Sequence, residues 1–169
     1  MNSLQEKYPK EIKDILEKYP TEEKRAAVMP LIYLAQREAG FVKKQDLFDI
    51  AEVIGSTATE IASIVGFYTL FHDKPGGKYR IQVCDDVSCA MRGADDFIEK
   101  LCENIGIRLG ETTEDGLVSV EAVKCLAGCD KGPVFQVQSE DGIIYYENQT
   151  LESAMQLIEE WRKKEGGEK

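Results

Sequence analysis

The chain is short of several residues that common kinds of site require. It has a single histidine, His72, and a single tryptophan, and it has no apolar run long enough to span a bilayer. Lys and Arg number 21 against 31 Asp and Glu, which gives a net charge of -10. Nucleic-acid binding asks for a basic face, so this balance argues against it, whereas an acidic soluble protein can dock with basic partners. One histidine also excludes a Rieske-type centre, which needs two.

Other absences limit the function further. Neither a P-loop nor a G-x-G-x-x-G pattern occurs, and Gly76-Gly77 is interpreted as a turn, so nothing predicts nucleotide or flavin binding by this chain. Residues 1–20 are charged throughout and lack the apolar core of a signal peptide. We therefore expect a cytoplasmic protein whose thiols are reduced or bound to metal. His72 is interpreted as an exposed linker residue, and the acidic segment 111–115 as a solvated loop.

What the chain does have is four cysteines in two short clusters. Cys84 and Cys89 have four residues between them, Cys125 and Cys129 have three, and 35 residues separate the inner two. Four thiolates are what a [2Fe-2S] cluster needs, and a C-x4-C pair with a distant second pair is a recurring layout for one. Small neighbours would let backbone amides approach the sulfurs: Ala90, Gly93, Ala94, Ala127, Gly128 and Gly132.

Two disulfides, a redox-active dithiol and a structural zinc site are the alternatives for these cysteines. Disulfides would leave one of the five cysteines unpaired, and a redox dithiol favours C-x-x-C. Zinc is the better rival, because sites of four cysteines are tetrahedral and structural, but neither pair has the usual C-x2-C spacing. The spacing favours iron–sulfur and leaves zinc open. Cys102 lies on an apolar helical stripe and is interpreted as a packed thiol without a ligand role.

Helical patterns fill the chain before Pro75, and their apolar stripes are interpreted as core. We expect amphipathic segments at residues 12–16, at 21–39 with a kink or break at Pro30, at 47–54, and from a capping box at Thr57–Glu60 through Tyr68.

The pattern changes at Pro75-Gly76-Gly77, which we take as the boundary between a domain of residues 1–75 and one of residues 76–169. Cys84 closes the first strand expected after it, and Cys125 follows the second. If these strands are neighbours in one sheet, their carboxyl ends bring the two pairs together, where α/β sheets usually host ligands. The expected order is strand 79–83, helix 94–105, strand 117–123, a hairpin of strands 134–138 and 143–147, a helix from Thr150, and a frayed tail at 163–169.

Blocks of residues in both halves match a known family. In the first half they are Tyr19-Pro20, residues 31–40 and residues 65–68; in the second they are residues 77–79 and 81–84, Cys89, residues 92–94 and 125–129, and Pro133-Val134. Over nearly its whole length the chain resembles the small [2Fe-2S] subunit of the NADH-oxidising module of respiratory complex I. The same family serves in NAD(P)-linked, including electron-bifurcating, [FeFe]-hydrogenases and in NAD-dependent formate dehydrogenases.

The resemblance implies an α+β fold, with an N-terminal helical bundle followed by a thioredoxin-like [2Fe-2S] ferredoxin domain. It implies that Cys84, Cys89, Cys125 and Cys129 hold the cluster, that Cys102 does not, and that the chain has no catalytic residues of its own. The implied function is electron transfer in a multisubunit NAD(P)(H)-linked oxidoreductase, beside an FMN- and NAD(H)-binding flavoprotein subunit and further iron–sulfur subunits, without membrane insertion. A stand-alone thioredoxin-like ferredoxin is the alternative, which the long helical half does not favour. That half is either a docking element or a brace.

Two departures from the family pattern lie at the second pair. The family commonly reads Cys-Leu-Gly-x-Cys, whereas residues 125–129 read Cys-Leu-Ala-Gly-Cys, with the glycine one place later. Lys131-Gly132-Pro133 stands where an alanine usually precedes the proline. We expect ligation to survive both departures, with an effect on hydrogen bonding to the sulfurs. Pro133 is a candidate cis proline.

Overall fold

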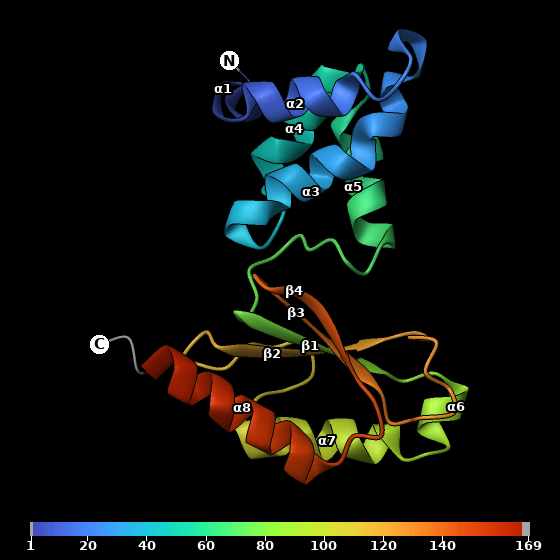
Figure 1. The fold of residues 1–169 in the computed structure, drawn as a ribbon, viewed down its shortest axis with the longest axis vertical. Helices are drawn as coiled ribbons and strands as arrows, with labels where there is room; N and C mark the ends of the chain where they lie inside the picture. The colour runs from blue at the N-terminus through green and yellow to red at the C-terminus, as the bar shows by residue number, and fades with distance from the viewer. Residues whose placement is uncertain (1, 167–169) are drawn as a thin grey trace. The chain divides into compact units, whose positions relative to one another are not determined.

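Two compact units make up the computed structural model, one within Met1–Pro75 and one within Gly76–Lys169, and the structure describes residues 2–166 (Figure 1). The first unit is helical and the second is a sheet with helices, so the predicted α+β class is confirmed. That these two units are separate domains stays a prediction.

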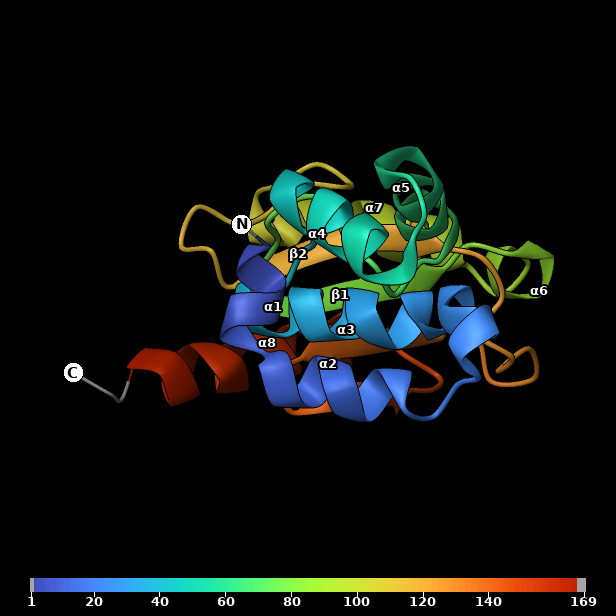
Figure 2. The ribbon, with the colours of Figure 1, turned by 90° about the horizontal axis from the view of Figure 1, so that it is seen from above.

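Amphipathic helices enclose one apolar core in the first unit. The helices are α1 (Ser3–Lys7), α2 (Pro9–Leu16), the 3-10 helix η1 (Thr21–Ala27), α3 (Val28–Ala39), α4 (Lys44–Ile54) and α5 (Ala58–Phe67). Leu31, Ile32, Ile50 and Ile61 are almost completely buried between them. In both views α2 and α3 lie side by side (Figures 1 and 2). Most residues of the apolar stripes predicted for this half are therefore core, as expected, but Phe48 of the predicted stripe on α4 is 53% exposed.

Local sequence fixes several helix ends in this unit. The predicted capping box is confirmed, because the Glu60 amide donates to Thr57 Oγ1 (3.3 Å) and the Thr57 amide donates to Glu60 Oε2 (3.1 Å). Gly40 and Gly55 end α3 and α4 at φ of 70° and 68°, a left-handed conformation that glycine adopts without steric cost.

Three expectations for this unit are wrong. The backbone departs from helical geometry at Glu23, inside η1 (φ -111°, ψ 26°), rather than at Pro30, which lies in the first turn of α3, where an N–H would have no intrahelical acceptor. Tyr68 follows the end of α5 and is 43% exposed. His72 is buried, because its amide donates to Gln36 Oε1 (2.8 Å) and its carbonyl accepts from the Val42 amide (2.7 Å).

A four-stranded mixed sheet forms the second unit, in the order β2-β1-β3-β4. Its elements are β1 (Tyr79–Cys84), α6 (Val87–Ala90), α7 (Ala94–Ile105), β2 (Val118–Val123), β3 (Phe135–Ser139), β4 (Gly142–Tyr146) and α8 (Leu151–Gly166). Strand β1 pairs parallel with β2 and antiparallel with β3, and β3 pairs antiparallel with β4. Figure 1 shows α7 and α8 on the same face of this sheet. The predicted order of strands and helices is confirmed, with the short helix α6 added.

Alternation along β1 gives the sheet one apolar face. Tyr79, Ile81 and Val83 belong to a core that α7 and α8 complete with Leu101 and Ile158. This period of two is what the sequence pattern of the strand predicted. The apolar face anchors β1 against the helices and so fixes where its last residue, Cys84, lies.

Polar side chains on the other side of β1 connect it to both neighbouring strands. Arg80 forms an ion pair with Glu121 of β2 (Nη1–Oε1 3.2 Å). Gln82 donates to Glu121 Oε2 (3.1 Å) and accepts from Gln136 Nε2 of β3 (2.7 Å). Because buried polar groups are costly unless they are paired, this network specifies the register of β1 between β2 and β3.

At the C-terminal end, α8 continues through residues 163–166, so that part of the predicted frayed tail is wrong; residues 167–169 lie outside the described chain. Trp161 stacks on Tyr79, with ring centroids 4.4 Å apart. Among residues 2–166 no single helix is both long and apolar enough to cross a membrane, and α4 with α5 meets those limits only as a pair bent by 117°.

Candidate metal centre

The four clustered cysteines lie at one edge of the sheet. Cys84 is the last residue of β1, and Cys125 follows two residues after the end of β2. Because β1 and β2 are parallel neighbours, with Cys84 opposite Val123, their carboxyl ends meet at the same edge. The sequence left open whether these two strands are neighbours, and the register shows that they are.

The first pair is buried. Cys84 and Cys89 are each 2% exposed, and the Cys84 amide donates to the carbonyl of Val134 (3.0 Å). Cys89 is carried by α6, where the Asp86 carboxylate accepts from the Val87 amide (2.9 Å) at the N-terminus. Burial, followed by a hydrogen bond with the Cys84 thiol, raises the pKa of Cys89 to about 11. Without metal this thiol stays protonated at neutral pH.

The second pair is exposed and lies on the loop between β2 and β3. The sulfurs of Cys125 and Cys129 are 3.6 Å apart. The Ala127 amide donates to Cys125 Sγ (3.4 Å), and Ala127 has a φ of 61°, in the left-handed region. A hydrogen bond with Cys125 is the largest cause that raises the pKa of Cys129. Ala127, which stands where the family commonly has glycine, thus has a backbone conformation that glycine adopts more easily than alanine.

Electrostatic coupling and close packing join the two pairs. The charge of Cys129 contributes to the raised pKa of Cys89, and the charge of Cys84 contributes to the raised pKa of Cys129. Gly132 lies against the first pair, since a Cβ there would be 3.2 Å from Cys89 Sγ. The Gly132–Pro133 peptide is cis, as predicted for Pro133.

The spacing of the sulfurs fits metal ligation. Two sulfurs bound to one tetrahedral metal at about 2.3 Å lie about 3.8 Å apart, close to the 3.6 Å between Cys125 and Cys129. Within residues 2–166 no three His, Cys, Asp or Glu side chains are grouped as ligands of a single ion. The sulfurs instead form two pairs, Cys84 with Cys89 and Cys125 with Cys129. A [2Fe-2S] cluster takes one pair of thiolates on each iron. These residues fit such a cluster.

Three polar residues near the cysteines were not predicted from the sequence. A hydrogen bond with the Ser88 hydroxyl lowers the pKa of Cys129 and partly opposes the effect of Cys125. Lys124 Nζ contacts both carboxylate oxygens of Asp85 (2.9 and 3.0 Å) and so connects the ends of β1 and β2. Only the proximity of Ser88 to Cys89 in the chain could have drawn attention to it, because its contact with Cys129 is tertiary.

Two further features lie apart from the four cysteines. Cys102 is buried on the apolar side of α7, which confirms its predicted packing role, and burial raises its pKa.

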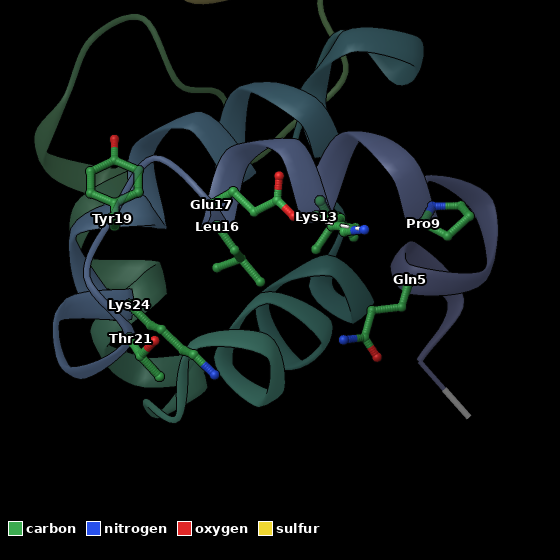
Figure 3. A pocket seen from close by; sticks show the side chains of 9 residues that line it. Gln5, Pro9, Lys13, Leu16, Glu17, Tyr19, Thr21 and Lys24 are labelled. Atoms are coloured by element: carbon green, nitrogen blue, oxygen red, sulfur yellow. Dashed lines mark ion pairs between the residues drawn. The ribbon is translucent and has the colours of Figure 1, made fainter.

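A hollow of about 590 Å³ in the helical unit is bordered by Ile12, Leu16 and Tyr19, with Lys13 and Glu17 at its side (Figure 3). None of the five cysteines borders this hollow, so it is not part of the candidate metal centre.

Comparison with protein families decides the class of this site. Residues 12–162 match the family model described as thioredoxin-like [2Fe-2S] ferredoxin. The chain belongs to this family. The resemblance predicted from the sequence is confirmed, and the cofactor of this thioredoxin-like ferredoxin is a [2Fe-2S] cluster.

Three curated relatives of this ferredoxin are named as subunits of NADH-quinone oxidoreductases. The one from Thermus thermophilus is 41% identical over 129 residues, which cover 76% of this chain and 71% of the relative. The one from Rhizobium meliloti is 35% identical over 90% of this chain and 87% of the relative. The one from Mycobacterium tuberculosis is 35% identical over 89% of this chain but only 57% of its own length.

Solved structures support the fold alone. The H2-reduced NAD+-reducing [NiFe]-hydrogenase matches with a TM-score of 0.66 and 21% identity, over 80% of this chain and 22% of the hydrogenase chain. The air-oxidised form of such a hydrogenase matches with a TM-score of 0.63 and 22% identity. This ferredoxin thus spans less than a quarter of the hydrogenase chains that it resembles.

Proposed function

We propose that this ferredoxin is the [2Fe-2S] electron-transfer subunit of a multisubunit NAD(P)(H)-linked oxidoreductase. The observation that carries the proposal is the meeting of two thiol pairs at the carboxyl edge of β1 and β2, in a chain of a [2Fe-2S] family. The relatives named as subunits of NADH-quinone oxidoreductases support this class of complex.

In this proposal Cys84 and Cys89 are the buried ligands of the cluster, and Cys125 and Cys129 are the exposed ones. A thiol must lose its proton to bind a metal, so ligation displaces the proton that Cys89 retains at neutral pH. When bound, a [2Fe-2S] cluster accepts and returns one electron at a time. The protein contributes the ligands, their burial and the hydrogen bonds around them.

The two cysteine pairs contribute differently to electron transfer, because one is buried and the other is exposed. The buried pair excludes water from one side, while the exposed pair leaves a short path for electrons between the site and a docked partner. The amide of Ala127 donates to Cys125 Sγ (3.4 Å), and the Ser88 side chain lowers the pKa of Cys129. Hydrogen bonds to ligand sulfur stabilise added negative charge, so the Ala127 amide raises the reduction potential.

The proposed partners are an FMN- and NAD(H)-binding flavoprotein subunit and further iron–sulfur subunits. We place this assembly in the cytoplasm, where thiols stay reduced or bound to metal. The helical unit serves either as a docking element for these partners or as a brace for the sheet unit.

Metal analysis of the native assembly, isolated without oxygen, tests the proposal. A flavoprotein should co-purify with the assembly. Because the other iron–sulfur subunits add iron, the counts are made on the full chain after its release from the assembly, where we expect two iron atoms and two acid-labile sulfides for each copy, a red-brown colour and an EPR signal after reduction. Zinc without sulfide would contradict the proposed site. Iron and sulfide without any flavoprotein would favour the stand-alone ferredoxin.

Alanine substitutions test the ligands one by one, since alanine has no ligand atom. Cys84→Ala and Cys125→Ala should each lower the iron content about tenfold or more. Cys102→Ala is the matched control and should keep full iron content, because Cys102 packs on α7 away from the four cysteines. Full iron content in either ligand variant would contradict the assignment.

A further inference from the structure

A second feature of the sheet unit, a groove of about 410 Å³, lies between α7 and the edge strand β2. Its floor is apolar and is formed by Ile98, Cys102, Ile107, Leu109 and Ala122. Leu109 is 49% exposed, so part of this apolar lining faces solvent. The floor offers apolar area that this chain does not cover.

The rim of the groove is acidic. Asp95, Glu99 and Glu103 follow each other at intervals of four along α7, so they form one row on its surface. All three are exposed, and within residues 2–166 none of them forms an ion pair with Lys or Arg. Like charges at this spacing repel each other, and of the three only Asp95, in the first turn of α7, gains from the helix dipole. Basic groups from another molecule would neutralise the row.

The groove also begins at the candidate metal centre. Asp85, which borders it, directly follows Cys84, and Ala122 precedes Cys125 by three residues. A protein segment seated in the groove would therefore hold its parent molecule beside the four cysteines. This step rests on the proposed electron-transfer function, because it gives a reason for docking at this place.

We propose that this groove docks a basic segment of the protein that exchanges electrons with this ferredoxin. Apolar side chains of the segment cover the floor, and its Lys or Arg side chains pair with Asp95, Glu99 and Glu103. Nucleic acids and anionic membranes carry the wrong charge for this rim. A second copy of the chain is disfavoured as occupant, because the net charge of each copy is -10.

Salt titration of the native assembly tests the docking groove. The assembly is isolated with either the wild-type chain or the D95N/E99Q/E103Q variant, and release of the chain from its partner is followed as KCl rises. At about 0.1 M salt we expect a dissociation constant about tenfold higher for the variant, and near 1 M salt we expect the two to converge, since screening removes the attraction.

A matched control separates the position of the charges from their number. The E114Q/E152Q/E159Q variant removes three exposed carboxylates of the same unit outside the groove and should bind like the wild type.

Carbodiimide treatment of the wild-type assembly should join Glu99 or Glu103 to a lysine of the partner, as mapped by mass spectrometry. Equal weakening by both triple variants, or cross-links from the rim only to lysines of this chain, would overturn the proposal.

Two readouts keep this inference apart from the proposed function. Iron content and the EPR signal should be unchanged in D95N/E99Q/E103Q, because none of the three residues borders the cysteine sulfurs. Unchanged partner binding with a normal cluster would overturn the docking groove alone, whereas iron retained in Cys84→Ala and Cys125→Ala would overturn the ligand assignment. Self-association of the free chain that the groove variant abolishes, measured by sedimentation, would assign the groove to a second copy and overturn the basic-partner proposal.

Discussion

The two cysteine pairs differ in how the protein holds them. Cys84 and Cys89 are buried at the end of β1 and on α6, whereas Cys125 and Cys129 are exposed on a loop without regular secondary structure. The sheet core fixes the position of the first pair. The second pair depends on the turns of its own loop, including the left-handed residue Ala127. One side of the site is therefore preorganised and shielded, and the other side is open to solvent or to a partner.

Alkylation of the metal-free protein should expose this difference most strongly. With iodoacetamide at pH 7.5, Cys125 should react about a hundredfold faster than Cys89, because Cys89 is buried and its raised pKa leaves little thiolate. Peptide mass spectrometry of timed samples measures the rates. Cys102 should react as slowly as Cys89, and all five cysteines should react at similar rates in denaturant. Similar alkylation rates for Cys125 and Cys89 in the folded protein would contradict the difference in accessibility between the two pairs.

Serine substitutions should separate the structural roles of the pairs. In the metal-free protein Cys84→Ser should lower the free energy of unfolding by about 2 kcal/mol, since a hydroxyl is placed in a buried, partly apolar site. Cys125→Ser should change it by less than about 0.5 kcal/mol, because the side chain is exposed. Urea unfolding followed by circular dichroism measures both. Equal losses would show that the loop is as firmly held as the strand.

Residues 127 and 128 allow a sharper test of the loop. Gly128→Ala should destabilise the protein by about 1–2 kcal/mol, because the new Cβ would lie 2.8 Å from Val134 Cγ2. Ala127→Gly should stabilise it by about 0.5–1 kcal/mol, since glycine adopts a φ of 61° without steric cost. The same urea titration measures both changes. Opposite signs are expected from neighbouring positions, and destabilisation by both would contradict the left-handed conformation of Ala127.

Much of the sheet unit could be predicted because its signals are local and periodic. Apolar alternation marked β1, and Asp141-Gly142 marked the hairpin of β3 and β4. The chain order of strands and helices then placed both cysteine pairs at strand ends. The sequence alone did not show that β1 and β2 are neighbours; their parallel register shows it, and the carboxyl ends of the two strands therefore meet.

The rest depended on tertiary contacts or on elements too short to show a period. Helix α6 has four residues, and only the capping residue Asp86 signals its start. The burial of His72 comes from bonds to Gln36 and Val42, more than 25 residues away in the sequence. The Ser88 side chain, on α6, lowers the pKa of Cys129 on the loop after β2, and no spacing rule anticipates this pairing.

A change in the helical unit should have the smallest effect and should leave both cysteine pairs as they are. Hydrogen bonds from Ser56 and Thr57 and an ion pair with Arg25 lower the pKa of Glu60 to about 2. Since this value lies below the ordinary one, the carboxylate stabilises the fold above about pH 4.5, and that stabilisation is lost as the pH falls toward 2. Glu60→Gln should therefore lower the Tm slightly at pH 7 and not at pH 2, as thermal unfolding measures, with unchanged alkylation rates of all five cysteines. A difference in Tm that is independent of pH would contradict the role of this charge.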